Sequence, residues 1–142
     1  MGVEEVNPPF LLDTCACHWL LDGTLSARPL RALTDAYNAG HFLFVSPITG
    51  LEIGLLERKR RFKSPLTPQK WFERLMSQLG ARQAEMPAEL LIESALLANY
   101  PNEDPFDRVI VTTAREYGFT VMTRDAAMIA YGREGYLSVL PC

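Results

Sequence analysis

Cysteine and histidine are scarce in this sequence, and their scarcity excludes two kinds of small stabilised protein. Only three cysteines and two histidines occur among the 142 residues. An odd set of cysteines, in which Cys15 and Cys17 are separated by one residue, does not resemble a disulfide framework. The histidines, His18 and His41, lack the paired-ligand spacing of a structural zinc site. We therefore expect free thiols and no zinc centre.

Long apolar runs and an amino-terminal targeting signal are also missing. No uninterrupted apolar stretch approaches the length that spans a bilayer. The segment from Met1 to Asn7 carries Glu4 and Glu5 where a secretory signal carries basic residues. These features predict a cytoplasmic protein with no membrane segment.

The composition predicts one globular domain over residues 1–142. Apolar residues make up 48% of the chain and charged residues 22%, which are ordinary values for a folded protein. The length suits a single hydrophobic core. The net charge of −3 lacks the strong positive excess that is typical of nucleic-acid-binding proteins, so any such contact must come from a local cluster of charge.

Short strands alternate with helices along the chain. Apolar runs predict strands at residues 10–13, 41–46, 81–86 and 120–123. Caps, prolines and apolar spacing predict helices that start at Ser26 and end by Gly40, and others at 47–61, 67–80, 87–99 and 104–118. Because parallel strands require crossover connections, this alternation indicates an α/β domain with a central, mostly parallel sheet flanked by helices.

Four aspartates lie at or near the expected strand ends. Asp13 follows the first strand and Asp125 the last, while Asp104 and Asp107 start the helix that leads into that last strand. Ligands of such sheets bind beyond the carboxyl ends of the strands, so these acids are placed to converge there. Taken singly, each also fits a helix cap or a first-turn acid, and Arg108 has the spacing to pair with Asp104.

Glu52 is harder to explain as a surface residue. It shares a helical stripe with apolar residues at Ile48, Leu51 and Leu55, which predicts that its carboxylate points inward. Asp107 likewise shares a helical stripe with apolar residues that follow it in its helix, which predicts that its carboxylate also points inward. A buried carboxylate must be neutralised, paired or bound to a cation.

An all-oxygen pocket of acids selects Mg²⁺ or Mn²⁺. Such a centre suits phosphodiester hydrolysis, because the metal polarises the phosphoryl oxygen, activates water and stabilises the leaving oxyanion. A nucleophilic serine or cysteine would need a positioned base, which neither histidine supplies by its sequence position.

Four segments in order resemble the PIN domain, and specifically its VapC-like toxins. They are LLDT at 11–14, VSPITGLEI at 45–53, DPFDRVIVTTA at 104–114 and VMTRD at 121–125. The resemblance covers nearly the whole chain. It implies an endoribonuclease that depends on Mg²⁺ or Mn²⁺, acts as the toxin of a toxin–antitoxin pair, forms a homodimer and is inhibited by a cognate antitoxin.

The same resemblance assigns roles to individual residues. Asp13, Glu52, Asp107 and Asp125 match the catalytic, metal-binding acids of the family, and Asp104 matches the leading acid of the DPFDR motif, as an outer metal ligand or a cap. Thr14 and Thr123 are expected to contribute hydroxyl groups. The chain departs from the family pattern at Cys15 and at Asn102-Glu103, where these toxins often carry histidine, and these departures bear on substrate preference.

A basic run follows the Glu52 helix and is the candidate RNA contact. It consists of Arg58, Lys59, Arg60 and Arg61. Its positive charge is suited to steering phosphates toward the acids, although cations at a helix end also offset the helix dipole. Trp71 and Leu75 in the next helix have the spacing of core residues rather than of a base-stacking platform.

Three other functions remain open. One is a PIN-domain nuclease that processes RNA without a toxin role. Another is a phosphoryl-transfer domain with Asp13 as nucleophile, although the second acid usual in that class is replaced by Cys15. The third is a non-catalytic, partner-binding module in which the acids only cap helices.

Overall fold

Five short parallel strands form one sheet in the order β3-β2-β1-β4-β5. The strands are β1 (Phe10–Leu12), β2 (Phe44–Val45), β3 (Arg82–Gln83), β4 (Thr120–Thr123) and β5 (Val139–Pro141). The structure, a computed structural model, describes residues 7–142. The prediction that Met1 to Asn7 carries no export signal therefore falls almost entirely outside the described residues.

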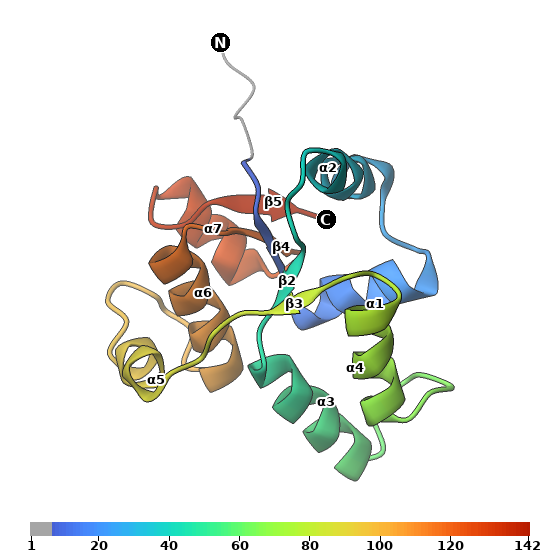
Figure 1. Ribbon diagram of the computed structural model, residues 1–142. Coiled ribbons are helices and arrows are strands. Elements are labelled where there is room, and N and C mark those ends of the chain that lie inside the picture. The colour runs from blue at the N-terminus through green and yellow to red at the C-terminus, as the bar shows by residue number, and fades with distance from the viewer. Residues whose placement is uncertain (1–6) are drawn as a thin grey trace.

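Seven helices connect these strands within the described part of the chain. They are α1 (Thr14–Asp22), α2 (Ala27–Asn38), α3 (Ile48–Arg58), α4 (Pro68–Ser77), α5 (Ala88–Ala95), α6 (Pro105–Tyr117) and α7 (Ala126–Arg133). Figure 1 shows α5, α6 and α7 on one side of the sheet, and α1, α2 and α4 on the other. The parallel sheet between two helical layers confirms the predicted α/β class.

The central strand β1 separates two hydrophobic cores. Its three residues are all buried, and their side chains alternate between the faces of the sheet, as in any strand. Leu12 packs on the side of α1 and α4, where Trp71 and Leu75 are buried as expected. Leu11 packs on the other side against α6, next to Ile110. A strand covered on both faces must be apolar throughout, which explains the run Phe-Leu-Leu.

Several elements are shorter than predicted. The strand expected at 41–46 is reduced to β2, because His41 and Phe42 are exposed before it. The helix expected at 47–61 ends at Arg58, and Arg60 adopts a left-handed φ of 58° that no helix continues. The helices expected at 67–80 and 87–99 end at Ser77 and Ala95.

Among residues 7–142, no helix combines the length and the apolar character that a bilayer span requires.

The buried face of α3 differs from the expected one. Leu51 is 55% exposed, although it was expected on the buried stripe of its helix. The side chains that α3 buries completely are Thr49 and Ile53, so its buried face is rotated relative to the expected one. Glu52 lies beside this face and is half-buried.

These positions give a paired test of the fold. Leu11→Ala removes a side chain that is fully buried in the central strand, and we expect it to lower the free energy of unfolding by about 2–5 kcal/mol. Leu51→Ala removes the same atoms from a largely exposed site, and we expect a change within about 0.5 kcal/mol. Urea denaturation measures both. Equal losses in the two variants would contradict the described burial.

Candidate active site

The buried carboxylate of Asp13 lies where the central strand ends. Its backbone N–H donates to Met122 O of the neighbouring β4 at 3.1 Å, which keeps the chain in the sheet until Asp13. Asp13 then becomes the N-cap of α1, and its Oδ1 accepts the Thr14 N–H at 2.8 Å. The side chain is only 8% exposed. A single residue thus ends a strand, starts a helix and presents a carboxylate at the carboxyl edge of the sheet.

Thr123 connects Asp13 to Asp125. Its hydroxyl donates to Asp13 Oδ2 at 2.8 Å and accepts the Asp125 N–H at 3.0 Å. Asp125 in turn caps α7 by accepting the Met128 N–H at 2.9 Å. Because Leu12 is paired with Met122 in the sheet, Asp13 and Thr123 are the next residues in register. The ends of two adjacent strands therefore carry both acids.

Thr14 connects Asp13 to Glu52. The Thr14 hydroxyl donates to Glu52 Oε1 at 2.8 Å and lies 3.0 Å from the Thr49 hydroxyl. Since Thr14 has one hydroxyl proton and gives it to the carboxylate, Thr49 is the donor in the second contact. These hydrogen bonds hold α3 next to the end of β1. Thr49 was not predicted to belong to the site; its place three residues before Glu52, on the same side of the helix, is the signal that could have found it.

Asp107 reaches the same edge from the first turn of α6. Its Oδ2 accepts the Asn102 side-chain N–H at 2.8 Å. Asp104 forms the N-cap of this helix, with Oδ1 accepting the Phe106 N–H at 2.9 Å, and it is exposed. The structure thus shows Asp104 acting as a cap. The four acids Asp13, Glu52, Asp107 and Asp125 are hereafter called the carboxylate site.

The ionisation of these acids shows that they share one region. The pKa of Asp107 is raised to about 7, first by burial and then by the carboxylates of Asp104, Asp13, Asp125 and Glu52. Burial also raises the pKa of Asp13 and of Glu52, against the lowering effect of their threonine hydrogen bonds. Nearby negative charges add to the rise in each case. A bound cation would offset both the burial of these carboxylates and the repulsion among them.

The donor set fits a hard divalent cation. Carboxylate and hydroxyl oxygens from four elements face one edge of the sheet, and such oxygens are the preferred ligands of Mg²⁺ and Mn²⁺. Within residues 7–142, no three His, Cys, Asp or Glu side chains are already gathered into a metal-binding cluster. Hydrogen bonds from Thr14, Thr123 and Asn102 instead orient the acids.

The cysteine thiols and the histidine ring near the site do not add charge to it or bind its acids. Partial burial and the surrounding acids raise the pKa of the Cys15 thiol to about 11, so it is neutral at physiological pH. The Cys17 thiol is buried and contacts Leu12 O. His18 packs against the rings of Trp71 and Phe62, with ring centroids 4.6 and 5.6 Å apart.

Arg108 does not form the ion pair with Asp104 that its spacing allows. The Arg108 side chain turns into the protein and is 8% exposed, and its guanidinium donates to backbone carbonyls. The basic run, by contrast, is exposed throughout, from the last residue of α3 into the loop that follows.

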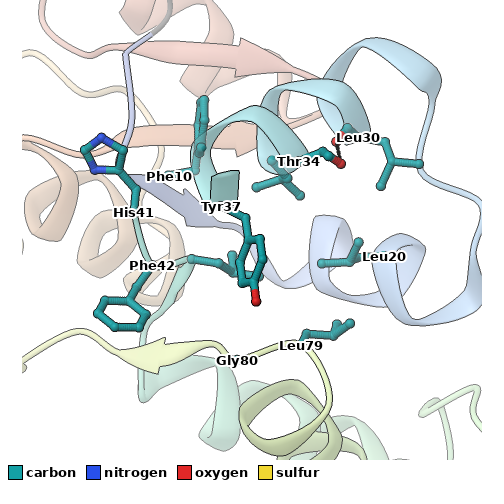
Figure 2. A pocket seen from close by; sticks show the side chains of 12 residues that line it. Phe10, Leu20, Leu30, Thr34, Tyr37, His41, Phe42, Leu79 and Gly80 are labelled. Carbon is teal, nitrogen blue, oxygen red and sulfur yellow. Dashed lines mark hydrogen bonds between the residues drawn. The ribbon is translucent and has the colours of Figure 1, made fainter. Parts of the chain in front are cut away.

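An apolar cavity of about 460 Å³ lies at the opposite edge of the sheet (Figure 2). Its lining includes Phe10 at the start of β1, Leu43 just before β2 and Gly80 shortly before β3, together with side chains of α2 such as Tyr37. These are the amino ends of the strands, whereas the acids occupy the carboxyl ends. The cavity is therefore separate from the carboxylate site.

Comparison with known proteins places these features in a family context. The PIN domain profile matches residues 10–134. Ribonuclease VapC22 of Mycobacterium tuberculosis is 28% identical over 118 residues, which are 81% of this chain and 85% of that protein.

Two solved structures resemble the fold. VapBC2 from Rickettsia felis, bound to a DNA fragment from its promoter, has a chain with a TM-score of 0.63 at 15% identity, covering 93% of this chain and 97% of that one. FitAcB from Neisseria gonorrhoeae has a TM-score of 0.51 at 20% identity, covering 93% and 96%. At these identities, the likeness concerns the fold alone.

The raised pKa of Asp107 predicts how the stability of the metal-free protein depends on pH. In the unfolded chain this carboxyl has its ordinary pKa of 3.8, whereas in the folded protein its pKa is about 7. The folded state binds more protons between these values, so the carboxyl's stabilising contribution is present below the lower pKa and is lost as pH rises through the higher one.

Asp107→Asn removes this dependence. In EDTA, we expect the melting temperature of the variant minus that of the unmodified protein to rise from pH 4 to pH 8. Circular dichroism measures both melting temperatures. A difference in melting temperature that is constant over this range would contradict the assignment.

Proposed function

Because the chain belongs to the PIN domain family, we propose that it is a Mg²⁺- or Mn²⁺-dependent endoribonuclease and the toxin of a toxin–antitoxin pair. The observation that carries this proposal is the hydrogen-bonded connection of Asp13 to Glu52 and Asp125 at the carboxyl edge of one parallel sheet, with Asp107 near enough for their charges to raise its pKa. The similarity to Ribonuclease VapC22 supports RNA as the substrate.

The four acids of the carboxylate site are the proposed metal ligands and catalytic residues, with Asp104 as an outer ligand that also caps α6. A bound divalent ion supplies polarisation of the phosphoryl oxygen and activation of water. The chain's own residues orient the ligands. Thr123 holds Asp13 and the backbone of Asp125 together, and Thr14 holds Glu52 beside them.

RNA contact is proposed for Arg58, Lys59, Arg60 and Arg61. This basic run begins at the carboxyl end of α3, the helix that carries Glu52, and all four side chains are exposed. Charges in this position attract the phosphate backbone irrespective of base sequence. Base preference must then come from other residues.

The proposed partners are a cognate antitoxin and a second copy of the chain. The resemblance to VapC-like toxins supports both, and exposed apolar side chains on α5 and at its C-cap provide surface for association: Leu91 is 38% exposed, Ile92 61% and the C-cap Leu96 76%. A cytoplasmic location fits the free thiols of Cys15, Cys17 and Cys142.

Removal of single acids tests the catalytic assignment. We expect Asp13→Asn, Glu52→Gln, Asp107→Asn and Asp125→Asn each to reduce Mg²⁺-dependent cleavage of a defined RNA by at least about 100-fold, because changes in mere outer-shell partners already cost about 10–100-fold. Gel assays with end-labelled RNA measure the rates. Asp35→Asn, at an exposed position of α2, is the matched control and should retain full activity. Unchanged cleavage by all four site variants would refute the proposal.

Metal binding is tested separately from catalysis by thermal unfolding. An ion that binds only the folded state stabilises it, by about 2.7 kcal/mol at a concentration 100 times its Kd. We therefore expect Mn²⁺ to raise the melting temperature and Asp13→Asn to abolish this rise. A non-catalytic module whose acids only cap helices would melt at the same temperature in EDTA and in Mn²⁺.

A further inference from the structure

The buried Arg108 guanidinium binds a row of backbone carbonyls. Its Nε donates to Ser94 O at 2.8 Å, and its two terminal nitrogens donate to Ala95 O, Leu97 O, Tyr100 O and Asn102 O at 3.4, 2.6, 3.3 and 3.0 Å. These carbonyls all belong to the end of α5 and the segment that connects it to α6. One side chain of α6 therefore fixes the path of the chain that precedes it.

Arginine is the residue that suits this position. Ser94 and Ala95 lie in the last turn of α5, where carbonyls lack partners within the helix and the helix dipole is negative. The planar guanidinium has five N–H donors spread over a fork, which matches five separate acceptors. A lysine ammonium has three donors at one point and cannot reach all of these carbonyls.

Asn102 is the last residue of the row, and its side chain donates to an acid of the carboxylate site. Arg108 holds its backbone carbonyl, while its side-chain Oδ1 accepts the Asp104 N–H at 2.9 Å. The Nδ2 group is thereby directed at Asp107 Oδ2, 2.8 Å away. The backbone carbonyl and the side-chain oxygen of Asn102 are thus each held by a hydrogen bond, in addition to the contact of its Nδ2 with Asp107.

We propose that Asn102 is a positioning residue that orients the Asp107 carboxylate for metal binding, and that Arg108 acts on the site through Asn102. This inference rests on the proposed function. Asn102 occupies one oxygen of Asp107 and so limits the rotation of the carboxylate. Arg108, which touches no acid of the carboxylate site through its guanidinium, sets the position from which Asn102 donates.

Asn102→Ser isolates the contact with Asp107. A serine hydroxyl is still able to accept the Asp104 N–H and close the turn, but it is too short to donate to Asp107. We expect the Kd for Mn²⁺, measured by titration calorimetry, to rise about 10–100-fold, with little change in the melting temperature in EDTA. Asn38→Ser, the same exchange at the exposed end of α2, is the matched control and should bind Mn²⁺ as the unmodified protein does.

Arg108→Lys tests whether Arg108 acts through Asn102. Alone, it should weaken Mn²⁺ binding and lower the melting temperature, because several buried carbonyls lose their donors. Combined with Asn102→Ser, it should lower the melting temperature further but weaken Mn²⁺ binding no further than Asn102→Ser does alone. Losses of Mn²⁺ affinity that multiply in the double variant would overturn the proposed order of action.

The outcomes separate this inference from the function on which it rests. If the unmodified protein does not bind Mn²⁺, the proposed function fails. If it binds Mn²⁺ and Asn102→Ser binds it equally well, the function stands and the positioning role of Asn102 is refuted. Should Arg108→Lys not fold, Asn102→Ser alone still decides the role of Asn102.

Discussion

Burial of one carboxylate at the end of the central strand is the constraint on which the rest of the site depends. Asp13 places a carboxyl group where β1 has apolar neighbours on both faces, so its oxygens need hydrogen-bond donors. Thr14 N–H and the Thr123 hydroxyl supply them. The same two threonines reach Glu52 and Asp125, and satisfying a single buried acid therefore brings two others beside it.

The sequence was sufficient to predict the parts of the molecule that follow from local rules. Apolar runs identified β1 and β4, and the Asp104-Pro105 start and Gly118 end defined α6 closely. Because parallel strands end at the same edge of a sheet, the predicted α/β class already placed Asp13 and Asp125 at that edge. Thr14 and Thr123, which the sequence predicted as hydroxyl groups of the site, donate to Glu52 and Asp13.

The remaining features depend on tertiary contacts that sequence patterns do not report. β5 has only three residues, one of them Pro141, and forms by pairing with β4 at the edge of the sheet. Leu51 was assigned to a buried stripe because helical spacing does not show which face of α3 the protein covers. Arg108 has the spacing of a surface ion pair, and only the fold places the carbonyls after α5 around its guanidinium. The contact from Asn102 to Asp107 was not predicted, because it also depends on the fold.

The position of a bound ion is the most direct test of the central claim, that separated acids gather around one divalent centre. Crystals grown with Mn²⁺, measured where manganese scatters anomalously, would show it. We expect an anomalous peak in contact with Asp13 and at least one of Asp107 and Asp125, with Glu52 facing the same ion or its bound water. A peak elsewhere on the protein, with the carboxylate site left empty at saturating Mn²⁺, would contradict the assignment.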